Sequence, residues 1–442
     1  MAEETNENKF KAPRGTRDFS GSEKRLRDAI IRAIRGQFER YGFEPLETPA
    51  FENLNVLTAK FAGGEEILKE TYSFKDQGER DLGLRYDLTV PLCRFVAENP
   101  SLAMPFKRYA IASVWRDGPL KKGRYREFTQ CDADTIGSKS IAADAEIASL
   151  AASVLSGLGL DYSLKVNNRK LLNGLLLAAG VQREMLSEVI LSLDKLEKIG
   201  AAGVQKELEE KQLPATVAQS ALSTLKSDAP LESLEPLATN DEARQGIVEL
   251  KEFFAYAKEY GCLDRIKFSP TLARGLNYYT GMVFEGFLNN GAKIGITSSV
   301  CGGGRYDELI GGFVKEAGGA ERNVPAVGIS FGLDVLLEAL KAQGTTLGER
   351  TGLAVFVIPI GDALPAIRAC QALRNAGVNT GIDLAGRGVS KNLAYAAKRG
   401  AKYALIIGPN ETKANKATLR DLSSGEEKLL TIQQVCDALK PV

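Results

Sequence analysis

The sequence predicts an α+β protein that contains antiparallel hairpin strands, a helical insertion and a smaller α/β domain near its C-terminal end. Two extended segments, 108–116 and 124–136, are separated by a short Gly-containing link, which is typical of an antiparallel hairpin. Between about 165 and 265 the segments are helical, short and broken by Gly or Pro. After residue 350, apolar strands and helical segments alternate, which predicts a small parallel sheet.

The first element expected is an amphipathic helix over residues 21–41. Ser20 and Glu23 form a capping signal, and Gly42 ends the run. Apolar side chains recur at every fourth position, at Leu26, Ile30, Ile34 and Phe38. The basic residues on the outer face of this helix fit a solvated surface better than a phosphate-binding track.

Residues 43–137 are expected to be mostly strands. The segment Leu84–Thr89 alternates between polar and apolar residues, so a strand here would place Arg85, Asp87 and Thr89 on one face. The link of the following hairpin carries basic residues at its tip. A helix is then expected over 140–158.

In the second half of the chain, strands and helices are expected to alternate. Strands resume near 266–287 and 293–301, and a helix follows near 331–341. The polar segment 341–350 resembles a linker. Beyond it, strands and helices are expected in the order 353–360, 364–376, 378–383, 390–399 and 403–408. Residues 351–442 hold twelve Lys and Arg against seven Asp and Glu, a balance of +5 that favours an anionic partner.

Composition excludes several kinds of chemistry. The chain has 442 residues, 44% of them apolar and 26% charged, which is ordinary for a globular protein of about two to four domains. It contains no histidine. A Ser-His-Asp triad, a Cys-His protease site and a histidine-ligated zinc are therefore excluded. Catalysis must use carboxylates, Arg, Lys, Tyr, Cys or groups of the substrate, and the protein itself is expected to cause no inflection of the reaction rate near neutral pH.

Cysteine spacing and hydropathy bear on location. The six Cys residues lie far apart and form no C-x-x-C pair, so free thiols in a reducing compartment are expected. The N-terminal residues lack the apolar core of a signal peptide, and no apolar run approaches the ~18 residues of a membrane span. A cytoplasmic location without membrane attachment is expected.

One expected strand carries an unusual row of side chains. Alternation places on one face Arg124, Arg126, Phe128, Gln130, Asp132 and Asp134. Such a row can bind phosphate at its Arg end, stack a base on its aromatic ring and accept hydrogen bonds from a cationic group. A solvated antiparallel face is the alternative, and the second polar row at 85–89 favours a site.

Two further segments are candidates for binding. In Leu272–Gly281, Arg274 precedes the pair Tyr278 and Tyr279, and this arginine is either a phosphate clamp or an ion-pair partner. The Gly-rich segment Cys301–Asp307 either lets backbone approach another group closely or forms a tight strand-to-helix turn.

Together these segments resemble the histidyl-tRNA synthetases, a class II aminoacyl-tRNA synthetase family. The strong signals are 274–281 and 301–307, which are similar to segments specific to the histidyl enzymes. The N-terminal 13–18 and motif 2, at 115–116 with 123–128, also resemble the family. Motif 1 at 42–49 and motif 3 at 324–332 are individually weak signals. The resemblance implies a class II catalytic domain at 1–340 with a helical insertion at about 165–265, a linker at 341–350 and an anticodon-binding domain at 351–442.

The resemblance also implies an activity and its residues. A cytoplasmic homodimer would activate L-histidine with ATP and Mg²⁺ and transfer it to tRNA-His. The histidine α-amino group would be held by Asp87, Thr89 and Gln130. The imidazole would be bound by Asp134, Tyr278 and Tyr279. The catalytic contacts to the α-phosphate would come from Arg116 and Arg274, and the adenine would stack on Phe128.

Two positions depart from the family pattern. Val335 stands where motif 3 normally has an arginine, and Gly118 stands where motif 2 has an acidic residue, with Asp117 one place early. Either ATP binds more weakly, or Asp117 and another cation compensate. The alternative function is a catalytically silent synthetase-like regulator or sensor of histidine or uncharged tRNA. A purely tRNA-binding module is disfavoured, because Asp134 and the tyrosine pair bring no advantage on phosphate.

Overall fold

A computed structural model describes residues 10–59, 68–225, 229–273, 278–316, 323–348 and 352–440. The chain divides into two compact units, one comprising residues 1–19 and 27–345 and the other comprising 20–26 and 346–442. None of the helices in the described ranges is long and apolar enough to cross a membrane. All six cysteines are buried and none is in a disulfide.

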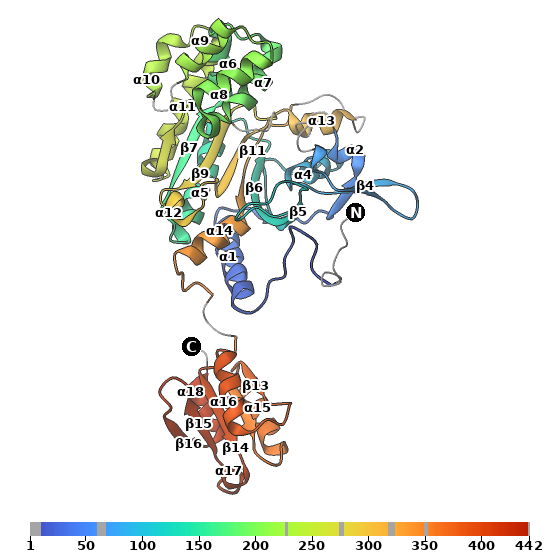
Figure 1. Ribbon diagram of the computed structural model, residues 1–442, viewed down its shortest axis with the longest axis vertical. Helices are drawn as coiled ribbons and strands as arrows, with labels where there is room; N and C mark the ends of the chain where they lie inside the picture. The colour runs from blue at the N-terminus through green and yellow to red at the C-terminus, as the bar shows by residue number, and fades with distance from the viewer. Residues whose placement is uncertain are drawn as a thin grey trace, which may run out of the picture. The chain divides into compact units, whose positions relative to one another are not determined.

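The larger unit is built on a sheet that has eight strands within the described residues (Figure 1). The strand order is β1-β5-β6-β11-β10-β9-β7-β8, and neighbours are antiparallel except the parallel edge pairs β1/β5 and β7/β8. These strands are β1 (Glu44–Pro45), β5 (Phe106–Trp115), β6 (Glu127–Ile136), β7 (Tyr162–Asn168), β8 (Ile266–Phe268), β9 (Met282–Leu288), β10 (Cys301–Arg305) and β11 (Ala326–Gly332). The predicted hairpin is present as β5 and β6.

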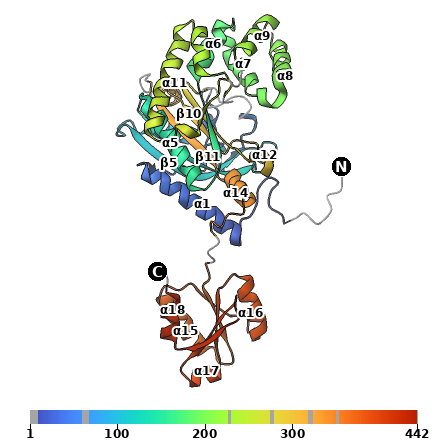
Figure 2. The same ribbon diagram turned by 90° about the vertical axis from the view of Figure 1, so that its left-hand side faces the viewer.

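Helices cover one face of this sheet. Figure 2 shows α1 (Gly21–Arg40) and α5 (Ile141–Gly157) across it. The ring of Phe38 on α1 lies 5.6 Å from that of Tyr109 on β5 and 6.0 Å from that of Phe331 on β11. The predicted helix 21–41 therefore buries its apolar stripe as expected. A further helix, α14 (Leu333–Ala342), follows β11 directly.

A small sheet with the order β2-β4-β3 precedes β5. Its strands are β2 (Phe51–Asn53), β3 (Ser73–Lys75) and β4 (Asp81–Leu84), and the helices nearby in sequence are α2 (Leu54–Leu57) and α4 (Thr89–Glu98). The predicted strand over 84–89 is wrong, because β4 ends at Leu84 and α4 begins at Thr89. Asp87 Oδ1 accepts a hydrogen bond from Val90 N at 3.0 Å and so satisfies a free N–H of the first helical turn.

Short helices fill the predicted insertion. They are α6 (Arg169–Ala178), η2 (Arg183–Met185), α7 (Leu186–Leu193), α8 (Leu196–Glu210), α9 (Ala215–Thr224), α10 (Leu231–Leu234), η3 (Glu235–Leu237), α11 (Asp241–Glu259) and η4 (Leu263–Arg265). The preceding residues form β7 of the main sheet, so the helical segment begins at Arg169 rather than at 165. A Cβ on Gly246 would overlap the backbone of Leu171, which explains how closely α11 and α6 pack.

The segment expected as a strand at 293–301 is wrong. Residues Gly291–Ile294 form helix α12, and β10 begins only at Cys301. The three glycines of β10 therefore lie within a central strand and not in a turn. A Cβ on Gly303 would overlap the carbonyl oxygen of Gly328 on β11, so the close approach of two backbones requires glycine there. Helix α13 (Leu309–Glu316) follows.

The smaller unit has a five-stranded sheet, in the described residues, with the order β13-β12-β14-β15-β16. Its elements are β12 (Val355–Pro359), α15 (Leu364–Asn375), β13 (Thr380–Ile382), α16 (Val389–Lys398), β14 (Tyr403–Ile407), α17 (Pro409–Lys413), β15 (Ala417–Asp421), β16 (Glu427–Leu430) and α18 (Ile432–Leu439). The strands β13, β12 and β14 are parallel, as predicted. The antiparallel strands β15 and β16 extend the sheet and were not predicted.

Candidate active site

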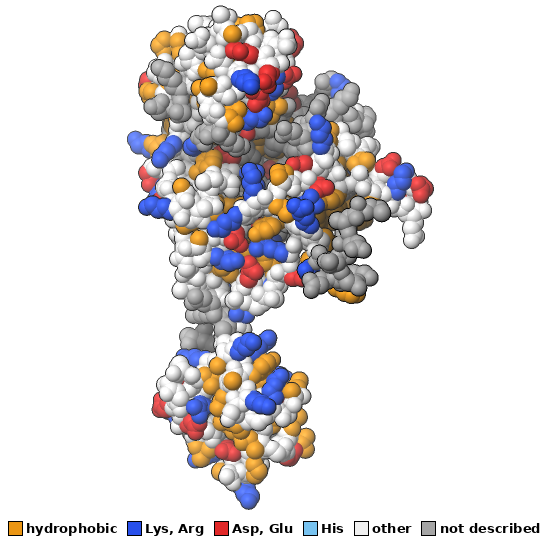
Figure 3. Space-filling view, in the orientation of Figure 1, with side chains coloured by type: hydrophobic (Ala, Val, Ile, Leu, Met, Phe, Trp, Pro, Cys, Tyr) orange, Lys and Arg blue, Asp and Glu red, His pale blue; other side chains and the backbone are white. Residues whose placement is uncertain are grey.

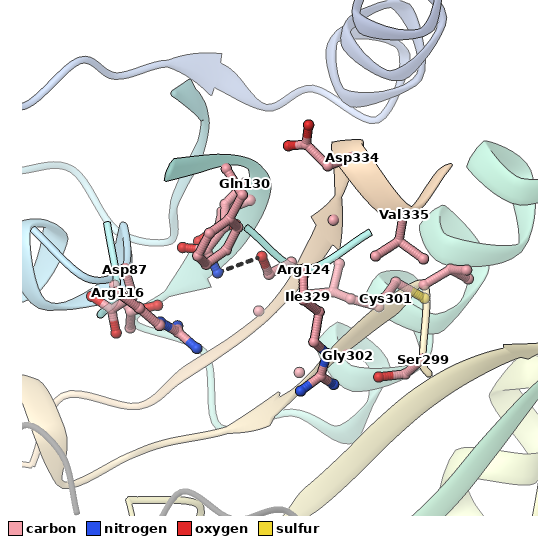
Figure 4. Close-up of a pocket in the computed structure, with 18 of the residues that line it drawn as sticks. Asp87, Arg116, Arg124, Gln130, Ser299, Cys301, Gly302, Ile329, Asp334 and Val335 are labelled. Carbon is pink, nitrogen blue, oxygen red and sulfur yellow. Dashed lines mark hydrogen bonds between the residues drawn. The ribbon is translucent and has the colours of Figure 1, made fainter. Parts of the chain in front are cut away.

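A cavity of about 520 Å³, shown in Figure 4, is lined by residues of the central strands β6, β10 and β11 and of the segments around them. Eight of the nine residues predicted from the sequence line it. They are Asp87, Thr89, Arg116, Phe128, Gln130, Asp134, Tyr278 and Tyr279. The ninth, Arg274, lies outside the described residues. Residues about 190 positions apart in sequence, such as Asp87 and Tyr278, are thus brought to one cavity by the sheet order.

The row predicted on residues 124–134 lines this cavity with one exception. Phe128, Gln130, Asp132 and Asp134 alternate along β6, and Arg124 precedes the strand. Arg126 does not line the cavity, because its guanidinium pairs with Asp117 at 2.8 Å. Its side-chain stem packs on Gly15, where a Cβ would lie 2.6 Å from Arg126 Cγ.

Arg85 also lies away from the cavity. It donates to the carbonyl oxygens of Thr48 at 2.7 Å, Ser113 at 2.9 Å and Pro49 at 3.1 Å. A buried guanidinium requires such acceptors, and here they tie three backbone segments together. The predicted face of Arg85, Asp87 and Thr89 is therefore wrong, although the last two do reach the site.

Asp87 and Arg116 lie near one another at one wall, as labelled in Figure 4. Burial raises the pKa of Asp87, while the backbone N–H of Val90 and the Arg116 charge oppose this shift. Arg116 Nε donates to the carbonyl oxygen of Tyr86 at 2.9 Å, and its guanidinium carbon lies 5.4 Å from the ring centroid of Phe128. This wall presents a fixed cation beside an aromatic ring.

Asp134 is held by two residues that the sequence analysis did not assign. Arg108 Nη2 on β5 lies 2.8 Å from Asp134 Oδ2, and Tyr306 Oη donates to Asp134 Oδ1 at 2.5 Å. Burial raises the pKa of Asp134, and the two partners oppose this shift. A Cβ on Gly328 would overlap Asp134 Oδ1, so glycine on β11 makes room for the carboxyl group.

Tyrosines form the wall next to this carboxyl group. The ring centroids of Tyr278 and Tyr279 are 4.8 Å apart, and Tyr306 lies 6.0 Å from Tyr278. Gly304 leaves space for this wall, because a Cβ there would lie 2.9 Å from Tyr279 Cδ1. The Gly-rich segment thus serves the site through close approach, the first of its two interpretations.

Both departures from the family pattern, Val335 and Gly118, line the cavity. Val335 is largely buried and lines it, and a Cβ on Gly123 would lie 3.1 Å from Val335 Cγ2. A Cβ on Gly118 would lie 2.8 Å from Glu70 Oε1, so the Glu70 carboxylate occupies the space of the missing side chain. The alternative that Asp117 compensates is not supported, because Asp117 pairs with Arg126 outside the lining.

Asp132 bears on the expected absence of a pH-rate inflection near neutral pH. Burial raises its pKa to about 7, helped by the charges of Asp134 and Asp87 and opposed by Arg108 and a hydrogen bond from Ser330. A carboxyl group therefore titrates near neutral pH in a chain without histidine. Arg108 and Tyr306 could have been suspected from the sequence, since Arg108 begins the segment 108–116 that was predicted to pair with 124–136, and Tyr306 lies in the Gly-rich segment.

The cavity carries charges of both signs. Three aspartates and an amide line it, at Asp87, Gln130, Asp132 and Asp134. Its cations are Arg116, Lys121 and Arg124, and the carboxyl groups of Glu70 and Asp334 also line it. Such a cavity can hold a cationic group beside a polyanion and bring the two into reaction.

Two family models match the chain. Residues 15–336 match the model described as histidyl-tRNA synthetase, and residues 354–441 match the anticodon-binding domain. Among curated relatives, histidine–tRNA ligase 1 of Bacillus thuringiensis subsp. konkukian is 43% identical over 429 residues, which cover 96% of this chain and 99% of that protein. The protein of the same name in Bacillus anthracis is 42% identical with the same coverage.

Solved structures agree in fold. The crystal structure of histidyl-tRNA synthetase from Nostoc sp. PCC 7120 matches with a TM-score of 0.81 at 32% identity, and the match covers 98% of this chain and 99% of that chain. The apo histidyl-tRNA synthetase of S. aureus gives a TM-score of 0.72 at 22% identity, a likeness of fold alone.

Proposed function

The chain belongs to the histidyl-tRNA synthetase family, and we propose that it is a histidine–tRNA ligase that activates L-histidine with ATP and transfers it to tRNA-His. The observation that carries this proposal is that eight residues assigned through the family resemblance line one cavity although they are far apart in sequence. The family match indicates the reaction, and the cavity is the expected binding site for histidine and ATP.

The first step of the proposed reaction joins histidine to the α-phosphate of ATP. A carboxylate oxygen of histidine attacks the α-phosphorus of ATP, a new O–P bond forms, and the bond from that phosphorus to the bridging oxygen breaks to release pyrophosphate. Arg116 would stabilise the charge that develops at the α-phosphate, with Arg274 as its expected partner. Phe128 would stack on adenine beside Arg116.

The aspartates of the cavity and the residues beside them would select histidine. Asp87, Thr89 and Gln130 would bind the α-amino group. Asp134, with Tyr278 and Tyr279, would bind the imidazole through its N–H and ring nitrogen. Because Asp134 is already anchored by Arg108 and Tyr306, its orientation is fixed before substrate arrives. An apolar isostere would leave buried polar groups unpaired, which makes the wrong amino acid costly to bind.

Transfer then moves histidine to tRNA. A hydroxyl of the tRNA 3′ end attacks the carbonyl carbon of the adenylate, an ester C–O bond forms, and AMP leaves with the former carboxylate oxygen. The smaller unit would bind the anticodon, in line with its family match and its excess of Lys and Arg. Figure 3 shows Lys and Arg side chains next to apolar ones on one face of this unit. This combination suits phosphates and unstacked bases.

Mg²⁺ is the ion expected to accompany ATP. In the described residues no three His, Cys, Asp or Glu side chains are grouped to hold a metal. Asp334 is engaged by Arg17, Arg27 and the backbone N–H of Thr129, and Asp134 by Arg108 and Tyr306. We therefore assign no protein ligand to Mg²⁺ and expect the phosphates of ATP to hold it.

Assembly and location rest on the family alone. The segment 42–49 resembles motif 1, which in class II enzymes builds the dimer interface, so a homodimer is proposed. A cytoplasmic location is proposed from the translation role of the family.

The test is amino-acid-dependent ATP–pyrophosphate exchange with the purified full chain, run against every proteinogenic amino acid. Exchange with histidine alone, followed by charging of tRNA-His, is the expected result. The second candidate, a silent sensor, is favoured by the apolar Val335 in place of an arginine. A folded protein that binds tRNA but shows no exchange with any amino acid would replace the ligase with that sensor.

A further inference from the structure

Asp132 lies in the cavity between Gln130 and Asp134 on β6, and the proposed reaction gives it no role. The residue is 3% exposed, and its Oδ1 is buried with no hydrogen-bond partner in the described part of the chain. An ionised carboxylate is costly to bury without a donor, so this oxygen calls for a ligand.

Ser330 on β11 determines which polar atoms of Gln130 and Asp132 are left without a hydrogen-bond partner among the described residues. Gln130 Nε2 donates to Ser330 Oγ at 3.1 Å, the dashed line in Figure 4, and a side-chain hydrogen bond from Ser330 reaches Asp132. A hydroxyl group has one proton, so Ser330 accepts from the amide and donates to the carboxylate. The amide is thereby held with its oxygen unused. Gln130 Oε1, like Asp132 Oδ1, is buried and has no donor among the described residues.

The positive charges near Asp132 do not balance the negative charges around it. Arg108 on β5 is shared with Asp134, to which it lies 2.8 Å away, and Asp87 adds a further negative charge. Arg85 interacts with Asp132 only at longer range, because its N–H groups are directed to backbone carbonyl oxygens. The free cavity therefore holds two unsatisfied acceptors and an excess of negative charge at one place.

We propose that Asp132 is a second counter-charge of the histidine α-ammonium group, beside Asp87, and binds this group together with the amide oxygen of Gln130. This inference rests on the proposed function. A compact ammonium group has three N–H donors and a full positive charge, so it can satisfy two acceptors anchored on the same hydroxyl. The two imidazole nitrogens point in divergent directions and cannot do so together, and a carboxylate would be repelled.

The proposal predicts that the affinity for histidine depends on pH. The pKa of Asp132 is about 7 in the free protein, so lowering the pH protonates it and removes the charge that binds the ammonium group. Histidine affinity should therefore rise as the pH increases through about 7. The same dependence should be weaker in Asp132→Asn, in which this carboxyl group no longer titrates.

The experiment compares two ligands in wild type and Asp132→Asn. L-histidine carries the ammonium group, and 3-(imidazol-4-yl)propanoate lacks it. Dissociation constants are measured by calorimetry at about pH 6 and about pH 8, and the KM values for histidine and ATP by pyrophosphate exchange. At the higher pH, Asp132→Asn should weaken histidine about 10- to 100-fold, the usual loss of a charged hydrogen bond, and leave the propanoate and the KM for ATP within about twofold.

A second variant, Ser330→Ala, keeps the charge but frees the Gln130 amide, so it should weaken histidine by a smaller factor. Equal loss for both ligands, or no loss for histidine in Asp132→Asn, would overturn the proposal. Wild-type exchange with histidine reports separately on the proposed function. If that exchange were absent, the proposed function would be refuted. The calorimetric comparison of the two ligands would still test the role of Asp132.

Discussion

Arg108 and Asp134 stand directly opposite one another on β5 and β6, with the guanidinium 2.8 Å from the carboxylate and both side chains almost fully buried. The pair lies beneath the end of the cavity where the imidazole is proposed to bind. The carboxylate that we propose to bind the imidazole is thus paired with a cation before any ligand arrives. The cation that holds it belongs to the sheet and not to the motif segments.

Replacing Arg108 by Met should leave Asp134 buried without its partner. Loss of one member of a buried pair costs about 3–5 kcal/mol, so the urea midpoint should fall clearly. The single tryptophan, Trp115, ends the same strand and reports on this sheet by fluorescence. Arg244→Met is the control, because its pair with Asp241 is exposed and should leave the midpoint unchanged. Equal midpoints for both variants would contradict the expectation.

Gly328→Ala should impair histidine binding. The added methyl group would overlap Asp134 Oδ1 and push the carboxyl group out of place. A displacement of that size at a binding group can cost roughly 10²-fold in kcat/KM, here for histidine and not for ATP. Gly36→Ala is the matched control, because its Cβ meets nothing within 4 Å on helix α1. An unchanged KM for histidine in Gly328→Ala would show that Asp134 is not needed where it stands.

Tyr306→Phe should act on the same carboxyl group without steric conflict. The variant removes the O–H that donates to Asp134 Oδ1, so the pKa of Asp134 should rise further and histidine should bind about tenfold more weakly. Steady-state exchange kinetics give the KM. Tyr256→Phe removes a comparable hydrogen bond to Glu252 on the exposed side of α11 and should change nothing. If both variants behaved like wild type, the anchoring role of Tyr306 would be refuted.

Arg116→Lys should slow activation more than it weakens histidine binding. Lysine keeps the charge but loses the planar fork and the hydrogen bond to the carbonyl oxygen of Tyr86. Loss of one preorganised group that stabilises transition-state charge costs about 10²–10³ in kcat. Arg126→Lys, on the same hairpin but paired with Asp117 outside the cavity, is the control. A variant with normal kcat and a raised KM for histidine would assign Arg116 to substrate binding instead.

Stability should depend on pH through Asp132. Its pKa is about 7 when folded and ~3.9 when unfolded, so the folded state binds more protons between these values. Folding stability therefore falls as the pH rises from about 4 to 7. Asp132→Asn should remove this loss and be more stable than wild type at about pH 8, on the order of a few kcal/mol, with the difference shrinking toward pH 4. Urea titrations followed through Trp115 measure it, and a variant less stable at every pH would refute the assignment.

The sequence predicted most of what depends on neighbours along the chain. The apolar repeat of residues 21–41 gave helix α1, and the alternation of 124–136 placed Phe128, Gln130 and Asp134 on one face. The same alternation rule failed at 84–89. Asp87 there satisfies a backbone N–H of α4, and the helix begins two residues later. Local pattern does not distinguish a short polar strand from the capped start of a helix.

What the sequence alone determined is which residue types can take part: no histidine, arginines and carboxylates in alternating rows, and glycines at 302–304. What only the tertiary structure decided is their environment. Ser330 and Gly328 reach the site from β11, which pairs with β6 although it lies nearly 200 residues later in the sequence. The charge state of Asp132 follows from burial and from a hydrogen bond to another strand, because desolvation and cross-strand contacts exist only once the sheet has formed.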